Sequence, residues 1–220
     1  MVYRRQFGLA CAAASRKESS LRNRSYTDVF FALWPDDATR SQIAQAISTL
    51  GGRVTATQNL HLSLGFVSHV SSTQMADFMR IGASLLQAPM ELQLTHIEYW
   101  RDVGIAALVL RQTPELLLHL VSQLREALGH YGLDADPRPF RAHVVVSRHI
   151  SDFRTKPLTS PIVWRPDCVA LVEPQLADRF RTYRVRETWP VGTCSCSAAK
   201  GACPHSLSAE ERSLLVPDQR

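Results

Sequence analysis

The stretch NLHLSLGFV, residues 59–67, constrains the fold most strongly, because its side chains alternate between apolar and polar. This period of two is typical of a strand with one buried face. The face expected in the core carries four apolar residues, Leu60, Leu62, Leu64 and Phe66. The opposite face carries His61 and Ser63, so an imidazole and a hydroxyl point off the same side of the predicted strand.

A second segment, FRAHVVVSRHI at residues 140–150, loosely repeats the first. Its alternation places His143, Val145 and Ser147 on one face of a predicted strand. A single strand histidine is more often a hydrogen-bonded structural residue, but equivalent strands of a two-lobed fold would bring His61 and His143 to one cleft. Such a pair suits phosphodiester chemistry, because one neutral imidazole can remove a proton while a protonated one donates to the leaving alkoxide.

The surrounding sequence alternates between strand-like and helical patterns. Capping residues such as Asp36, Pro114 and Gly132 help to define three predicted helices, at residues 36–51, 73–88 and 114–132. The other predicted strands are residues 29–35, 90–100, 105–112, 167–175 and 181–190. Paired strands with helices in similar positions predict an α+β protein of two related halves.

Both ends of the chain look like appendages to a domain at residues 27–191. The net charge is +5, but the excess of Lys and Arg lies in residues 1–26, a basic arm expected to be disordered. The charge is therefore poor support for nucleic-acid binding by the folded body. Residues 192–220 are expected to be a flexible tail. Its Cys194, Cys196, Cys203 and His205 are potential zinc ligands, but their spacing and polar surroundings argue against a zinc site.

The composition favours a cytoplasmic protein. No apolar run is long enough to span a bilayer, so no membrane partner is expected. The odd count of 5 cysteines favours reduced thiols. Neither motif histidine has a second ligand at metal spacing, so no metal or other cofactor is expected, and nothing in the pattern requires more than a monomer.

Five collinear segments resemble the two-histidine (2H) phosphoesterase superfamily, and within it the bacterial RNA 2',3'-cyclic phosphodiesterases, also called LigT-like or 2'-5' RNA ligases. The likeness covers roughly residues 28–190 and includes the paired His-x-Thr/Ser (HXTX) motifs. It implies a bilobal fold with two antiparallel sheets and flanking helices around a central cleft. The segments are VFFALWPDDATR, NLHLSLGFVSHV, IEYWRDVGIAALV, RPFRAHVVVSR and LVEPQL with YRVRETWP.

The resemblance implies a role for each residue of the two motifs. His61 would donate a proton to the leaving ribose oxygen, and His143 would accept a proton from water. Ser63 and Arg148 would bind the phosphate, a role that suits the fixed donor fork of arginine. The implied hydrolase opens 2',3'-cyclic phosphate ends of RNA to 2'-phosphomonoesters, with weak 2'-5' RNA ligation as the reverse reaction.

The second motif departs from the family pattern, because Val145 stands where threonine or serine is expected. Loss of one phosphate donor costs about 3 kcal/mol, or roughly 100-fold in rate, which predicts a slowed enzyme. One alternative is a catalytically weakened module that binds RNA ends or nucleotides. Another is an enzyme that acts on small cyclic nucleotides. Ser147 could replace the hydroxyl only through a bridging water or a local bulge.

RNA contacts are expected around the second motif. Arg138 and Arg141 are predicted to contact the polynucleotide electrostatically. Four aromatic residues near strand ends are candidates for base stacking, although core packing explains each of them equally well: Trp34, Phe66, Trp100 and Tyr183.

Overall fold

The computed structural model describes residues 26–85, 88–133, 138–151, 153–177 and 180–192. The predicted N-terminal arm and C-terminal tail, with the four potential zinc ligands of the tail, lie outside the described residues. The boundaries predicted for the domain at residues 27–191 stay a prediction.

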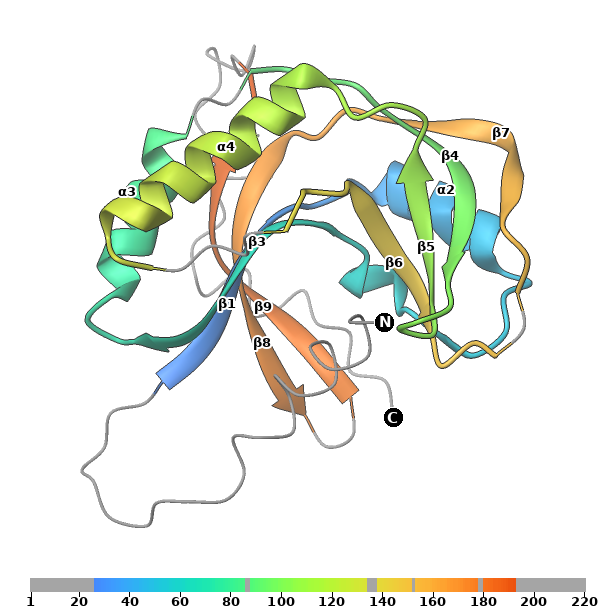
Figure 1. Cartoon of the computed structure of the whole chain (residues 1–220), viewed down its shortest axis with the longest axis horizontal. Coiled ribbons are helices and arrows are strands. Elements are labelled where there is room, and N and C mark those ends of the chain that lie inside the picture. The colour runs from blue at the N-terminus through green and yellow to red at the C-terminus, as the bar shows by residue number, and fades with distance from the viewer. Residues whose placement is uncertain (1–25, 86–87, 134–137, 152, 178–179, 193–220) are drawn as a thin grey trace.

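The strands form one antiparallel path, in the order β7-β4-β5-β6-β3-β1-β8-β9, with β2 paired to β6 (Figure 1). The path is strongly splayed, so that β1, β3, β8 and β9 form one half and β4 to β7 form the other. The bounds are β1 (Tyr26–Leu33), β2 (Arg53–Val54), β3 (Leu62–Ser71), β4 (Leu92–Trp100), β5 (Ile105–Leu110), β6 (His143–Arg148), β7 (Lys156–Trp164), β8 (Cys168–Ala177) and β9 (Phe180–Pro190).

The two halves meet at a narrow junction. Strands β3 and β6 share a single registered pair, Leu62 with Val144. The two antiparallel sheets of the predicted bilobal fold are therefore joined there into one path. The α+β, LigT-like fold class is confirmed.

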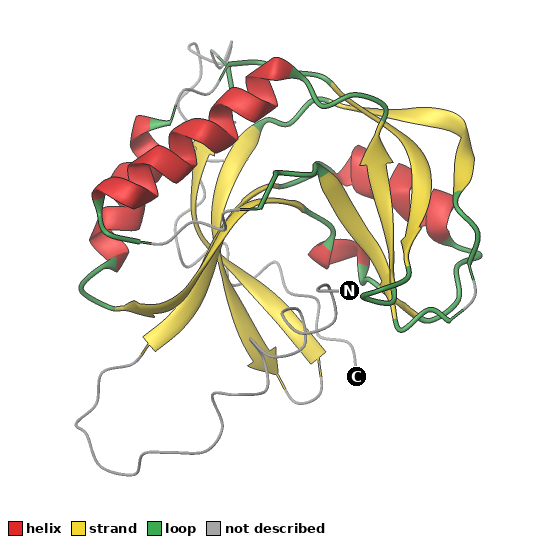
Figure 2. Ribbon diagram, viewed as in Figure 1, coloured by secondary structure: helices red, strands yellow, loops and turns green. Residues whose placement is uncertain are grey.

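Each of two long connections places its helix on the opposite half (Figure 2). Helix α2 (Asp37–Ile47) follows β1 but packs against β7, whereas α4 (Glu115–His130) follows β5 but packs against β3. Helix α3 (Met75–Ser84) lies beside α4 and covers β8 and β9. The predicted Asp36 cap of α2 is present, since its carboxylate accepts from the Thr39 amide at 2.8 Å.

Bulges interrupt the alternation of β3 and β6 at equivalent places. In the pairing of β3 with β1, Ser63 and Gly65 lie opposite two adjacent residues of β1, so Leu64 is the inserted residue of a β-bulge. In the pairing of β6 with β5, Val145 and Ser147 likewise lie opposite two adjacent residues of β5, so Val146 is the inserted residue. Each bulge follows its motif histidine by three residues, and each reverses which side chains face the core.

The bulge in β3 corrects one prediction. Phe66 was expected on the buried face, but its side chain is 45% exposed. Val67 and Val70 are buried in its place. Gly65 lies against α4, where an added Cβ would come within 3.1 Å of Leu124.

Two strands were not predicted. Strand β7 contains Pro157 and Pro161, which are tolerated because β7 is an edge strand that pairs only with β4. Its last residue, Trp164, is fully buried and fixes the strand against the core. Strand β2 has only 2 residues, too few to produce a periodic pattern.

Candidate active site

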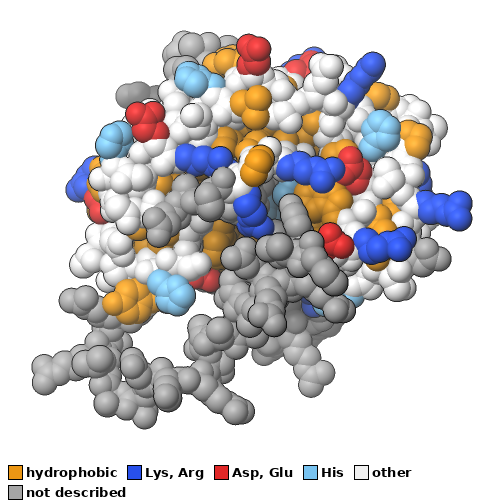
Figure 3. Space-filling model, viewed as in Figure 1, with side chains coloured by type: hydrophobic (Ala, Val, Ile, Leu, Met, Phe, Trp, Pro, Cys, Tyr) orange, Lys and Arg blue, Asp and Glu red, His pale blue; other side chains and the backbone are white. Residues whose placement is uncertain are grey.

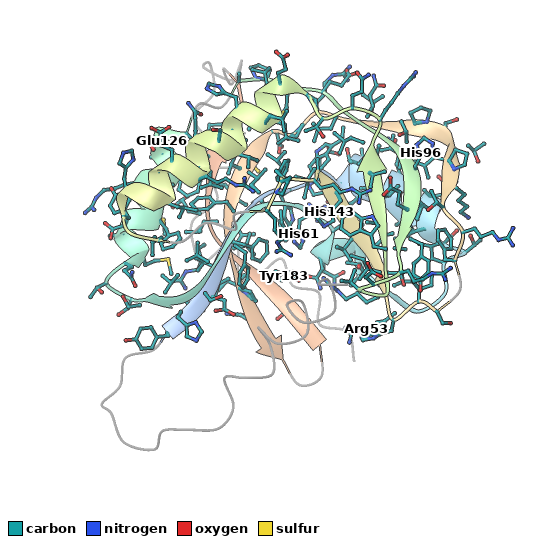
Figure 4. All side chains as sticks on the ribbon, in the orientation of Figure 1. Arg53, His61, His96, Glu126, His143 and Tyr183 are labelled. Carbon is teal, nitrogen blue, oxygen red and sulfur yellow. The ribbon has the colours of Figure 1, made fainter. Side chains whose placement is uncertain are left out.

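The junction between the halves brings the two motifs together. His61 directly precedes β3, and His143 is the first residue of β6. Continuing the Leu62–Val144 register by one residue in each direction sets Ser63 opposite His143 and His61 opposite Val145. These four side chains share one face, with the histidines on a diagonal of roughly 7 Å. Figure 4 shows His61 and His143 adjacent at the centre of the molecule.

The ring of each motif histidine is held by a hydrogen bond to a backbone carbonyl. His61 Nδ1 lies 2.7 Å from the carbonyl oxygen of Asn59. His143 Nδ1 lies 2.7 Å from the carbonyl oxygen of Arg141. A carbonyl oxygen can only accept, so Nδ1 carries the proton in each ring. In the neutral state, Nε2 is then the free basic nitrogen of both histidines.

The bulge in β6 brings Arg148 to the histidine side. In a regular strand, a residue five positions after His143 would lie on the opposite face. The extra residue Val146 reverses the phase, and the charge of Arg148 acts on both imidazoles. The predicted phosphate-binding arginine therefore lies with the two histidines.

Both imidazoles are difficult to protonate in the ligand-free protein. The pKa of His61 is lowered to about 4, chiefly by burial; the charges of Arg148 and His143 act in the same direction, and the hydrogen bond to the Asn59 carbonyl opposes them. Burial also lowers the pKa of His143, with Arg141 and Arg148 acting in the same direction against the bond to the Arg141 carbonyl. At neutral pH we therefore expect both rings to be neutral until an anion binds.

Aromatic rings surround His61. The Trp34 ring lies parallel to the imidazole, with 5.4 Å between centroids and 6° between planes. Phe30 is 4.9 Å away, and Tyr183 meets the ring edge-on at 5.1 Å. Tyr183 lies on the β9 side of His61 (Figure 4). These rings exclude water from one side of the imidazole, which explains the large effect of burial on its pKa.

Charged and aromatic groups together surround His143. The Trp100 ring lies 4.6 Å from the imidazole. The guanidinium carbon of Arg141 lies 4.5 Å from the centre of the Trp100 ring. Glu98 accepts a hydrogen bond from Trp100 Nε1 at 3.0 Å and forms an ion pair with Arg141. Glu98 was not predicted, because only the folded chain brings it to Arg141.

The hydroxyl groups of the two motifs differ in placement. Ser63 is exposed and, within the described part of the chain, its hydroxyl has no protein partner. Ser147 was expected on the histidine face, but this was wrong, because the bulge turns its side chain inward. It is fully buried, and its Oγ donates to the Gly51 carbonyl at 2.7 Å. Ser147 therefore cannot replace the hydroxyl missing at Val145.

The predicted RNA contacts fall into two groups. Arg141, Trp34, Trp100 and Tyr183 all lie beside a motif histidine. Arg138 is exposed, and its carbonyl oxygen accepts from Arg125 of α4, so its contact with RNA stays a prediction. Figure 3 shows Lys and Arg side chains, with hydrophobic ones between them, around the middle of the visible face. This surface has the charge that an anionic ligand requires.

Two other classes of site were sought in the described residues. They contain no group of three or more His, Cys, Asp or Glu side chains arranged to hold a metal ion. Their helices include none long and apolar enough to cross a bilayer.

Comparison with known proteins found one relative in sequence and several neighbours in structure. No protein-family model matches the chain. The RNA 2',3'-cyclic phosphodiesterase of Escherichia coli (strain K12) is 29% identical over 133 residues, which are 59% of this chain and 76% of that protein. A crystal structure of a phosphoesterase is 25% identical, with a TM-score of 0.71 over 76% of this chain and 99% of the other. The structure of E. coli LigT complexed with 3'-AMP is 24% identical, with the same TM-score and coverage.

These similarities agree with the site geometry. The matched structures share the overall fold that brings the two histidines of this chain together. The resemblance first seen in the motifs is thus supported by a relative in sequence and by neighbours in structure. Together, the sequence relative and the shared fold support a place for this chain among the LigT-like two-histidine phosphoesterases.

Proposed function

We propose that this phosphoesterase hydrolyses 2',3'-cyclic phosphate ends of RNA to 2'-phosphomonoesters without a metal ion. One observation carries the proposal: two histidines, each with Nδ1 held by a backbone carbonyl, flank the Leu62–Val144 pair with Nε2 free. The E. coli relative carries the name of this activity.

In the proposed reaction, the histidines have opposite roles. Nε2 of neutral His143 accepts a proton from water as the water oxygen bonds to phosphorus. Nε2 of protonated His61 donates its proton to the ribose O3' as the bond between O3' and phosphorus breaks. The phosphate stays on O2', and one water is consumed. Ser63 and Arg148 bind the phosphoryl oxygens and stabilise the charge that develops on them.

The low pKa of His61 makes its protonation depend on substrate. Without a ligand, His61 has a pKa of about 4 and lacks the proton that it must donate. A bound phosphate anion offsets the charge of Arg148 and favours the imidazolium. We therefore expect phosphate binding to be accompanied by proton uptake near neutral pH.

Related ligands and the cellular setting belong to the same proposal. E. coli LigT has been crystallised with 3'-AMP, NADP+, ATP and phosphate, so free nucleotides are plausible ligands beside RNA ends. We propose that the protein acts in cytoplasmic RNA processing as a monomer, with weak 2'-5' ligation as the reverse reaction.

A second candidate function follows from Val145. The valine lies opposite His61 in the continued register, where a hydroxyl would bond the phosphate. With Ser147 committed to Gly51, no neighbouring hydroxyl on β6 replaces it. A protein that binds RNA ends or nucleotides with little turnover is therefore the alternative.

The test is hydrolysis of a short RNA with a 2',3'-cyclic phosphate end, in EDTA, by the natural protein and by His61→Ala and His143→Ala. We expect a 2'-phosphate product, and each substitution should lower the rate by about 10²- to 10⁴-fold. His96→Ala is the matched control, because His96 is exposed at the outer edge of the molecule (Figure 4). Loss of activity in EDTA that returns with metal would refute the mechanism, and tight binding without turnover would favour the alternative.

A further inference from the structure

Three side chains beside His143 form a connected cluster that the proposed reaction does not use. Glu98 and Trp100 lie on β4, and Arg141 lies just before β6. The same oxygen of Glu98, Oε2, accepts from Trp100 Nε1 and pairs with the Arg141 guanidinium. The guanidinium also lies over the Trp100 ring, at 4.5 Å from its centre. Arg141 is thus fixed in position by two neighbours.

This arrangement makes Arg141 a poor phosphate ligand. Its charge is offset by Glu98, and the nearby carboxylate would repel a phosphate. The Arg141 side chain is nevertheless 59% exposed, and contact with Trp100 occupies only one face of a planar guanidinium. An exposed, flat guanidinium is a surface on which nucleobases stack.

The cluster also lies at a suitable place for a base. The backbone carbonyl of Arg141 accepts a hydrogen bond from Nδ1 of His143. The residue that carries the guanidinium is therefore the same residue that orients the imidazole. Two residues along a strand span about 7 Å, a separation that a ribose can bridge. Around the other histidine, Trp34 is already stacked on His61, and Phe30 is buried.

We propose that Arg141, held flat by Trp100 and Glu98, binds the base of the nucleotide whose phosphate lies between His61 and His143. This inference rests on the proposed function for the place of the phosphate. Since every base has a π face, stacking on Arg141 accepts all four bases. The subsite therefore recognises a nucleoside phosphate as a class and does not select a sequence.

Calorimetric titration with 2'-AMP and with inorganic phosphate tests the proposal. Arg141→Ala and Arg141→Lys should each weaken 2'-AMP binding by at least about fivefold and leave phosphate binding within about twofold. The bond to His143 comes from the backbone and survives both substitutions. Arg165→Ala is the matched control, because Arg165 forms an exposed ion pair with Glu91 at 2.6 Å and should change neither affinity.

Several results would overturn the subsite. One is the behaviour of a phosphate contact. Arg141→Ala would then weaken 2'-AMP and phosphate binding equally and reduce the salt dependence by about one charge, and Arg141→Lys would retain both affinities. Another is a natural protein that binds 2'-AMP no tighter than phosphate, or binds neither. Because binding is measured with a product-type ligand, failure to hydrolyse RNA would refute the proposed function and leave this comparison to decide the subsite.

Discussion

The two histidines share one backbone geometry but lie in different environments. Each ring is fixed by a 2.7 Å contact between Nδ1 and a carbonyl two residues earlier. His61 is enclosed by the rings of Phe30, Trp34 and Tyr183, whereas His143 is bordered by Trp100 and the ion pair of Arg141 with Glu98. The repeated strand therefore determines how each imidazole points, and the surrounding side chains determine how readily it takes a proton.

The motifs also differ in their hydroxyl groups. In the continued register, Ser63 stands opposite His143, and Val145 stands opposite His61. His61, the proposed proton donor, is thus the histidine that faces a valine instead of a hydroxyl. Three changes test how much each of these differences matters.

The largest effect is expected from the hydroxyl groups. Val145→Thr should raise kcat for RNA cyclic phosphate hydrolysis by roughly 100-fold, and Ser63→Val should lower it by a similar factor. Threonine has nearly the shape of valine, so packing is preserved, and Val145→Ala controls for a change of bulk alone. Steady-state rates measure both effects. If Val145→Thr has no effect while Ser63→Val is damaging, only the hydroxyl beside His143 is used.

An effect of similar size in free energy is expected on stability at low pH. The pKa of His61 falls from 6.5 to about 4 on folding, so the unfolded chain binds more protons between these values. The free energy of unfolding should therefore be highest above pH 6.5 and decrease, by up to about 3 kcal/mol, as pH falls toward 4. The lowered pKa of His143 acts in the same direction.

Urea unfolding across this pH range measures the loss. His61→Gln removes the titrating group and should flatten the dependence, whereas the exposed His96→Gln should retain it. An unchanged slope in His61→Gln would show that other groups cause the acid sensitivity.

The smallest effect is expected from the ring stacked on His61. Trp34→Leu should remove a contact of about 1 kcal/mol and lower kcat roughly fivefold, while Trp34→Phe should retain most of the rate. Without the Trp34 ring, water reaches the His61 imidazole more easily, so the pKa of His61 should rise toward 6.5 in the leucine variant. NMR titration of the imidazole protons checks this shift. A reduced kcat with no change in that pKa would mean that Trp34 contributes through general packing.

Local pattern was sufficient to predict the main elements and to single out two histidines that the structure brings together; their roles stay predictions. The period-two segments around His61 and His143 and the capped helices led to the α+β fold, and the motif resemblance led to the family. Phe66 and Ser147 were placed on the wrong faces, because a bulge changes the phase of a strand without changing its composition. Strand β7 was missed because Pro157 and Pro161 resemble loop residues.

The surroundings of the histidines were only partly predictable. Trp34, Trp100 and Tyr183 were proposed near the cleft from their positions at strand ends. Glu98 could not be proposed, since it lies 43 residues from Arg141 in sequence and no local pattern links the two. Contacts of this kind depend on how β4 and β6 are aligned by β5, which only the tertiary structure shows.

The crossed placement of α2 and α4 has a consequence for the unfolding of the chain. Each half is covered by a helix whose connecting strand belongs to the other half. Excision would take α2 from the half that contains β7 and would leave the other half with α3 but without α4, so the protein should melt in a single transition.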